Sequence, residues 1–215
     1  MRRLHPDPAE VSAAEALAEV DFAALAPDDR PYLILNMVAS ADGRATLEGK
    51  TAQLSSEADK EMFHTLRRQV DGVLVGTGTL REERYGPLIR DGDEQPVAIV
   101  CSRTGEFPED IGLFTDPRSR VFRYTGPSPG EALRRAQAEC GVRSVLCEGG
   151  PTLNGALLGE GVVDELFLTI SPLLADRPAP LTIVEAAGLD EPVSLELVWV
   201  LEAEGMLFLR YALVR

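Results

Sequence analysis

The sequence predicts an α/β protein with a mostly parallel, doubly wound sheet that ends in an antiparallel hairpin. Short apolar runs alternate with helical stretches through the middle of the chain, which is typical of parallel strands joined by helices. Near the carboxyl end, two runs of alternating hydrophobicity flank Glu204-Gly205, the signature of a hairpin. The 215 residues, 45% of them hydrophobic, are enough to bury one large core.

The first thirty residues differ in pattern from the remainder of the chain. They carry an Ala-rich helical periodicity that Ala26-Pro27-Asp28-Asp29 closes. We therefore expect a helical appendage over residues 1–30 and one main domain over residues 31–215.

The expected strands of the main domain are short and apolar, and helices separate most of them. The strands are expected at residues 32–38, 72–76, 97–101, 120–124, 143–147, 163–170, 194–201 and 206–214. Helices are expected at residues 55–69, 129–140 and 152–159, with a helical turn at 79–84. Ser55 and Ser56 open the first of these helices and Glu57 lies in its first turn, a pattern that satisfies free backbone N–H groups.

Two glycine corners carry the strongest functional signal. The first, residues 75–79, and the second, residues 148–153, each follow a short apolar strand. Glycine allows the backbone to turn sharply and a ligand to approach it, and the free N–H groups of a following helix attract anions. Two such corners at the carboxyl edge of one sheet fit a phosphate-rich cofactor.

Charge and composition exclude several classes of partner. Lys and Arg number 21 against 35 Asp and Glu, and the formal net charge of −14 repels nucleic acids and anionic membranes. The chain has no apolar run near 18 residues and no signal-peptide pattern, and its three cysteines lack a C-x-x-C spacing. We therefore expect a cytoplasmic protein with buried thiols and no nucleic-acid or membrane partner. With two histidines, we also expect no metal site.

The corners match neither of the common phosphate-binding motifs. Arg81 occupies the third glycine position of a dinucleotide fingerprint, and no Gly-Lys-Ser/Thr sequence occurs. What remains is a set of backbone and hydroxyl donors at the two corners. Ser102-Arg103 follows the strand at 97–101 at the same edge, and its arginine suits the 2′-phosphate that distinguishes NADP from NAD.

Four motifs occur in an order that resembles a known family. They are Ser40-x-Asp42-Gly43-Arg44, Leu66-Arg67 before the first corner, Glu148-Gly149-Gly150-Pro151-Thr152-Leu153, and Val163-Asp164-Glu165-Leu166. Over roughly residues 32–215, this ordered set resembles the reductase domain of the bacterial riboflavin-biosynthesis deaminase-reductase. The resemblance implies a dihydrofolate-reductase-like fold and an NADPH-dependent reductase that opens the ribose of a phosphoribosylamino-pyrimidine to a ribityl chain. Neither H-x-E nor P-C-x-x-C is present, so we expect a stand-alone reductase without the zinc deaminase half.

The resemblance also implies roles for individual residues. Residues expected to bind NADPH are Val38, Gly76, Gly78, Thr79, Glu83, Ser102, Arg103, Gly149, Gly150, Pro151, Thr152, Leu153 and Asn154. Residues expected to bind the substrate are Asp42, Arg67, Arg90 and Glu148, with the two arginines on its 5′-phosphate. Hydride transfer to a cationic imine would be helped by a carboxylate, and Glu83 is the expected catalytic group.

The chain departs from the family at two places, and alternatives stay open. Glu83-Arg84-Tyr85 stands where the family usually has Asp-Asp-Pro, and Leu54 where it usually has Trp. One alternative is a dihydrofolate or pterin reductase of the same fold, which would use an acid on the first core helix, here Asp59. Another is a non-catalytic NADPH sensor. We also expect a homodimer, because the strands at 163–170 and 194–214 carry more apolar side chains than a solvated sheet face tolerates.

Overall fold

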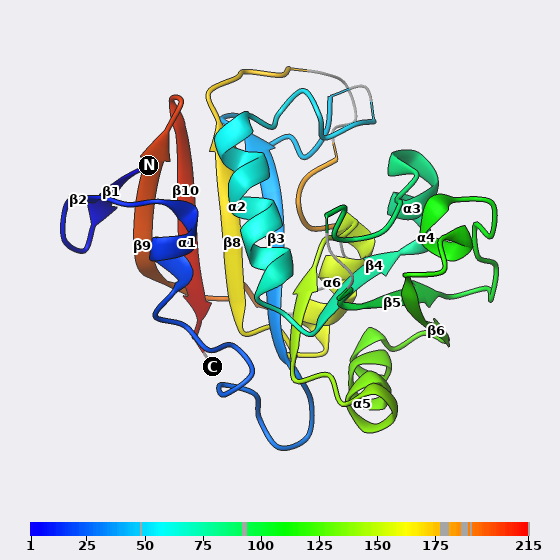
Figure 1. Cartoon of the computed structure of the whole chain (residues 1–215). Helices are drawn as coiled ribbons and strands as arrows, with labels where there is room; N and C mark the ends of the chain where they lie inside the picture. The colour runs from blue at the N-terminus through cyan, green and yellow to red at the C-terminus, as the bar shows by residue number, and fades with distance from the viewer. Residues whose placement is uncertain (48, 92–93, 177–180, 186–188, 190, 215) are drawn as a thin grey trace.

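A single mixed sheet runs through the protein (Figure 1). The computed structural model describes residues 1–47, 49–91, 94–176, 181–185, 189 and 191–214. Within these residues the sheet has ten strands in the order β2-β1-β9-β10-β8-β3-β7-β4-β5-β6. The strands are β1 (Arg2–His5), β2 (Ala9–Glu10), β3 (Tyr32–Ser40), β4 (Gly72–Gly76), β5 (Val97–Ser102), β6 (Arg120–Thr125), β7 (Ser144–Cys147), β8 (Glu165–Ser171), β9 (Leu195–Ala203) and β10 (Met206–Leu213).

The sheet has a parallel part and an antiparallel part, as expected. Strands β8, β3, β7, β4, β5 and β6 are parallel neighbours, whereas β10 pairs antiparallel with both β8 and β9. The helices are α1 (Ala13–Leu17), α2 (Glu57–Arg68), α3 (Thr77–Glu83), α4 (Gly112–Thr115), α5 (Pro129–Cys140) and α6 (Pro151–Gly159). The parallel sheet followed by a C-terminal hairpin confirms the expected α/β class.

Two hydrophobic clusters fill the two faces of the sheet. Because side chains alternate along a strand, Ile34 joins one cluster while Leu33 and Leu35 join the other. The first cluster includes residues of α1, α2, α3 and α4, and the second includes residues of α5 and α6. Helices on both faces make the sheet doubly wound.

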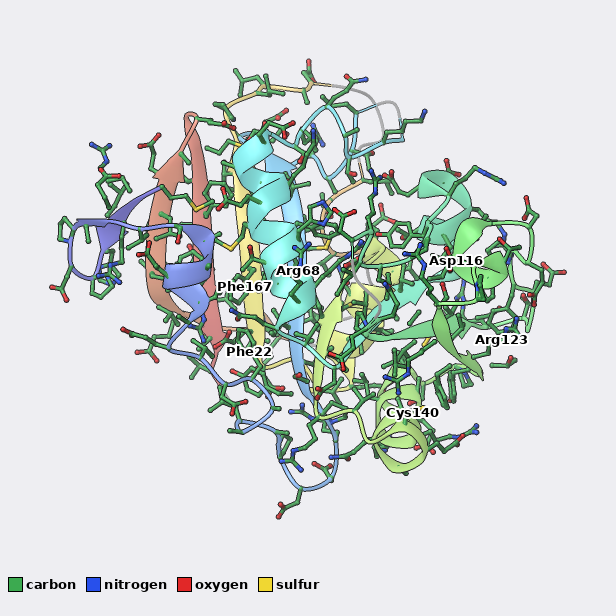
Figure 2. All side chains as sticks on the ribbon, viewed as in Figure 1. Phe22, Arg68, Asp116, Arg123, Cys140 and Phe167 are labelled. Atoms are coloured by element: carbon green, nitrogen blue, oxygen red, sulfur yellow. The ribbon has the colours of Figure 1, made fainter. Side chains whose placement is uncertain are left out.

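The N-terminal segment is not the helical appendage that we expected. Only Ala13–Leu17 is α-helical, and Arg2–His5 pairs with the edge of β9 to extend the sheet. Phe22, 1% exposed, packs edge-on against Phe167 with ring centroids 6.3 Å apart (Figure 2). The expectation was wrong because the free edge of β9 offers backbone groups that a nearby segment can pair with. The division at residue 30 stays a prediction.

The fold brings the two glycine corners side by side at the carboxyl edge of the parallel strands. Strands β4 and β7 are direct neighbours, and the Gly76 N–H donates to the Gly149 carbonyl at 3.0 Å. A side chain on Gly150 would meet Thr79 Oγ1 at 3.1 Å, a contact tight enough to displace the hydroxyl. The close approach of the other corner therefore favours glycine at this position.

Two buried ion pairs connect the start of β8 to its two neighbours, one to the segment before β3 and the other to β10. Arg30 donates to Asp164 at 2.7 and 2.9 Å, and Arg210 on β10 donates to Glu165 on β8 at 2.9 and 2.6 Å. All four side chains are at most 11% exposed. Each pair is bidentate, the geometry in which arginine and carboxylate bind most strongly.

Candidate active site

Two cavities meet at the edge of the sheet where the glycine corners lie. The corner cavity, lined by both glycine corners, has a volume of about 590 Å³, and the α2 cavity, lined by one face of α2, has a volume of about 600 Å³. The residues that line both cavities are Met37, Ala45, Thr51, Thr79, Glu83 and Glu148. Molecules bound in the two cavities would therefore touch at these side chains.

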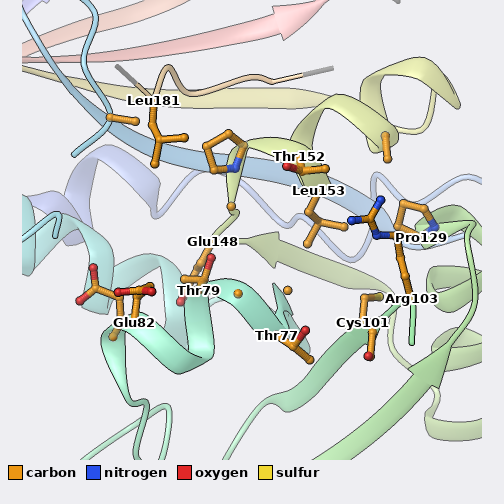
Figure 3. Close-up of a pocket in the computed structure, with 18 of the residues that line it drawn as sticks. Thr77, Thr79, Glu82, Cys101, Arg103, Pro129, Glu148, Thr152, Leu153 and Leu181 are labelled. Atoms are coloured by element: carbon orange, nitrogen blue, oxygen red, sulfur yellow. The ribbon is translucent and has the colours of Figure 1, made fainter. Parts of the chain in front are cut away.

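The corner cavity offers donors for an anion. The α6 helix begins at Pro151 with Gly150 as its N-cap, and no side chain caps its first turn. The N–H groups of that turn are thus available to a ligand, and the helix dipole favours a negative one. Thr77 and Thr79 on α3 face α6 across the cavity (Figure 3).

Most of the residues expected to bind the cofactor line the corner cavity. They are Gly76, Gly78, Thr79, Glu83, Ser102, Arg103, Gly150, Pro151, Thr152 and Leu153. Arg103 is exposed at the end of β5, and Figure 3 shows its guanidinium beside Pro129 at the start of α5. The Ser102 hydroxyl accepts from the Gly105 N–H and donates to the Glu106 carbonyl, both at 3.0 Å. Ser102 therefore holds the turn that carries Arg103.

Three of the expected cofactor residues lie elsewhere. Val38 lines the α2 cavity, and the carbonyl of Gly149 accepts a hydrogen bond from the Gly76 N–H. Asn154 is completely buried, and its Nδ2 donates to the Ile183 carbonyl at 2.8 Å. Its side chain cannot reach a ligand in the corner cavity, because its position in the first turn of α6 directs it into the protein interior.

The α2 cavity is lined by the polar face of an amphipathic helix. The α2 residues that line it recur at helical spacing and are Asp59, Lys60, Phe63, His64 and Arg67. On the opposite face, Met62 and Leu66 are buried in the core. Burial of that apolar face fixes which polar side chains of α2 reach the cavity.

Arg67 and Glu148, both expected to bind substrate, bind each other. Arg67 Nε and Nη2 donate to the two carboxylate oxygens of Glu148, each at 2.7 Å, and Nη1 donates to the Leu88 carbonyl at 2.8 Å. The guanidinium lies 4.1 Å from the centroid of the Phe63 ring and 5.3 Å from that of Tyr85. Three of the five N–H groups of Arg67 are thus taken by protein acceptors, which makes Arg67 poorly suited to the expected role in binding a phosphate.

Tyr85 completes this cluster through a bond to Glu148 that the sequence did not indicate. Its hydroxyl donates to Glu148 at 2.9 Å, although the two residues are 63 positions apart. Burial, followed by the charge of Glu148, raises the pKa of Tyr85 well above its usual value. The phenol therefore stays protonated and remains a donor to the carboxylate.

Glu83 lies at the junction of the two cavities. Its Oε1 accepts from the Thr51 hydroxyl at 3.1 Å and from the Thr51 N–H at 3.3 Å. The side chain is only partly buried and lines both cavities. Its carboxylate can therefore contact ligands in both.

Asp42 and Asp59 have different surroundings. Asp42 accepts from Ser40 Oγ at 2.6 Å and from the Ala175 N–H at 3.0 Å, and it lines neither cavity. These two bonds, Ser40 first, lower its pKa, so Asp42 is a charged anchor for a loop, and its expected contact with the substrate stays a prediction. Asp59 does line the α2 cavity, where it accepts from Ser55 Oγ at 2.6 Å. Arg90 lines the same cavity, as expected.

The described residues contain neither a metal-binding cluster nor a membrane-spanning helix. Within that part of the chain, no group of three or more His, Cys, Asp or Glu side chains is arranged to hold a metal ion. None of the helices described is long and apolar enough to cross a membrane.

Comparison with known proteins identifies the family. A 2,5-diamino-6-ribosylamino-4(3H)-pyrimidinone 5′-phosphate reductase from Methanothermobacter thermautotrophicus is 27% identical over 188 residues, which cover 75% of this chain and 87% of that protein. The riboflavin biosynthesis protein RibD of Mycobacterium tuberculosis is 32% identical over 164 residues, and the match spans 46% of that longer protein.

Solved structures agree with the fold. A pyrimidine reductase-like protein from Corynebacterium diphtheriae superposes with a TM-score of 0.79 at 20% identity, covering 95% of this chain and all of the other. A riboflavin biosynthesis reductase from Saccharomyces cerevisiae gives a TM-score of 0.71 over 94% of this chain and 99% of the other, also at 20% identity. The expected dihydrofolate-reductase-like fold is confirmed. The model of the RibD C-terminal domain matches residues 31–204, and the chain therefore belongs to the RibD C-terminal domain family.

Proposed function

We propose that this protein is an NADPH-dependent reductase that converts the ribosyl group of a 5′-phosphorylated ribosylamino-pyrimidine into a ribityl chain. The observation that carries the proposal is the meeting of two cavities of similar size at Thr79, Glu83 and Glu148. One has the donors that a phosphorylated dinucleotide requires, and the other is polar and rich in cationic side chains. Such an arrangement suits a transfer between two bound molecules, because it converts a bimolecular step into one within a complex.

The corner cavity fits NADPH in the chemistry of its donors. The uncapped first turn of α6 would hold the pyrophosphate, and Arg103 would hold the 2′-phosphate at the outer end. The cofactor supplies the hydride, and the protein supplies position and charge. Arg103 is the reason to propose NADPH in preference to NADH.

In the α2 cavity the substrate would present its C1′ atom to Glu83. When the C1′–O4′ bond breaks and the ring oxygen takes up a proton from solvent to become the 4′-hydroxyl, a cationic imine forms between C1′ and the exocyclic nitrogen. Addition of a hydride to C1′ then gives the neutral secondary amine. The Glu83 carboxylate, held by Thr51 at the junction, would stabilise the cation that forms before the transfer. Glu148 is neutralised by Arg67 and would shape the wall through Tyr85.

The names of the relatives support a pyrimidine substrate. The position of Asp59 supports the alternative, a pterin substrate. Asp59 is an acid on α2 that faces the α2 cavity, as a dihydrofolate reductase of this fold would require. The test is to follow the loss of NADPH absorbance with three acceptors: 5-amino-6-(5-phosphoribosylamino)uracil, its 2,5-diaminopyrimidinone counterpart, and dihydrofolate. Turnover of dihydrofolate alone would overturn the proposal, and turnover of none of the three would favour a non-catalytic sensor.

We further propose a cytoplasmic homodimer. Leu195, Leu197 and Leu207 are 42%, 38% and 38% exposed, and β9–β10 pairing places them on the sheet face opposite Trp199 and Phe208. Burying this apolar face against a second copy would stabilise the dimer through the hydrophobic effect. The free thiols of Cys101, Cys140 and Cys147 suit the reducing conditions of the cytoplasm.

A further inference from the structure

The α2 cavity is lined by several basic side chains, and not all of them are needed to pair with the acidic side chains of its walls. The cationic or titratable bases that line it are Lys60, His64, Arg67, Arg84 and Arg90. Arg67 is bonded to Glu148 and the Leu88 carbonyl, and Arg84 donates to Asp110 at 2.9 Å outside the cavity. Arg67 is therefore occupied by buried protein partners, and the exposed Arg84 is paired with an acid that does not line the cavity.

The other three bases are free to meet a ligand. Among the described residues, the imidazole of His64 and the guanidinium of Arg90 have no hydrogen bond, and His64 contacts the ring of Phe63 at 5.5 Å between centroids. Lys60 pairs with Glu57 at 2.6 Å, but both side chains are more than half exposed and such a pair is worth little. Lys60 and His64 lie one turn apart on α2, and the charge of Arg90 acts on His64.

In the described part of the chain, no acidic side chain that lines this cavity is hydrogen-bonded to Lys60, His64 or Arg90. Asp59 accepts from Ser55, Glu83 accepts from Thr51, and Glu148 is neutralised by Arg67. A phosphomonoester carries a charge of about −1.5 to −2 at neutral pH and has three strong acceptor oxygens. Lys60, His64 and Arg90 supply the matching positive charge and donors.

We propose that the phosphate of the substrate is held by His64, Lys60 and Arg90, and that Arg67 serves instead to position Glu148. This inference rests on the proposed function, since it assigns the phosphate end of the same substrate. The sequence analysis assigned the phosphate to Arg67 and Arg90 together. The inference keeps Arg90, removes Arg67 and adds Lys60 and His64 of α2.

Binding of a phosphate should change the protonation of His64. In the free protein, burial and then the charges of Arg67, Arg68 and Arg90 lower the pKa of His64, and Glu148 opposes them. The other charged groups that line the cavity around it are Asp59, Lys60, Glu83 and Arg84. A bound dianion would favour the imidazolium, so binding takes up a proton and weakens as pH rises through the pKa of His64 in the complex.

The direct test is a titration of the imidazole by NMR in the full chain. The chain has only two histidines, and His5 lies exposed on β1, so it is an internal control. We expect ribose 5-phosphate to raise the pKa of His64 and leave that of His5 unchanged, and ribose without phosphate to move neither. An unchanged pKa of His64 under saturating ribose 5-phosphate would overturn the inference.

Kinetics of variants provide the second test. We expect His64→Gln and Arg90→Gln each to raise KM for the phosphorylated substrate about tenfold or more, and to leave KM for its dephosphorylated form within about twofold. Arg123→Gln is the matched control, because Arg123 is exposed on β6 and lines neither cavity (Figure 2). An equal rise in KM for both forms of the substrate would show that His64 and Arg90 do not bind the phosphate.

The two tests separate this inference from the proposed function. Ribose 5-phosphate binding does not depend on turnover. If His64 responds to ribose 5-phosphate while no pyrimidine is reduced, the phosphate site stands and the proposed reaction fails. If a phosphoribosylamino-pyrimidine is reduced while both variants match the unaltered protein, the reaction stands and the phosphate assignment fails.

Discussion

Replacement of Glu83 by glutamine tests the chemistry of the junction directly. The side chain keeps its size, and its oxygen can still accept from the Thr51 hydroxyl and N–H, which now lie 3.1 and 3.3 Å from Oε1. The substitution therefore removes the charge with little change of shape. Any loss of turnover then measures the electrostatic contribution.

The size of the loss follows from Coulomb's law. A carboxylate about 6 Å from the cationic carbon, at an effective dielectric constant of about 20 for a partly buried site, contributes about 2.8 kcal/mol. That energy corresponds to a fall in kcat of about 100-fold. We expect the affinity for NADPH to change much less, because the cationic imine belongs to the substrate.

The assay is steady-state turnover of the phosphoribosylamino-pyrimidine, with Asp59→Asn as the counter-test. Asp59 faces the α2 cavity but is not assigned a role in the pyrimidine reaction. If Glu83→Gln keeps full turnover while Asp59→Asn loses it, the reasoning about Glu83 is refuted and the pterin alternative takes its place.

Three further predictions concern the cofactor, stability and assembly. Arg103→Ala should weaken NADPH binding about tenfold and leave NADH binding unchanged in a fluorescence titration. The expected loss is moderate because Arg103 is exposed, and a charge-assisted contact is weaker at an exposed site than at a buried one. Equal losses for the two cofactors would show that Arg103 is structural. Arg210→Met should lower the free energy of unfolding by about 3–5 kcal/mol in urea, because Glu165 would keep a buried, unpaired charge, and Glu165→Met added to it should restore part of the loss. Leu207→Asp should convert the dimer into a monomer in sedimentation experiments, and a monomeric unaltered protein would contradict the dimer itself.

Local patterns in the sequence determined much of the fold. The expected helix at 129–140 and the expected strand at 72–76 have the bounds found in the structure. In both, the information is local: helical periodicity with a serine cap in one, and a short apolar run ending at a glycine corner in the other. The order of the motifs was also enough to indicate the family. The pairing of β1 with β9 was not predictable, because it depends on an exposed strand edge almost 200 residues away.

The functional site was only partly determined by the sequence. Gly76, Gly150, Arg103 and Glu83 line the corner cavity at the sheet edge where the sequence placed them, and their roles in binding and catalysis stay predictions. The sequence could not show that Arg67 is bonded to Glu148, 81 positions away, and is therefore occupied. Whether a charged side chain is available to a ligand depends on which partners the folded chain brings within hydrogen-bond distance, and those partners come from remote segments. Residue types determine what chemistry is possible here, and tertiary contacts decide which residues are free to perform it.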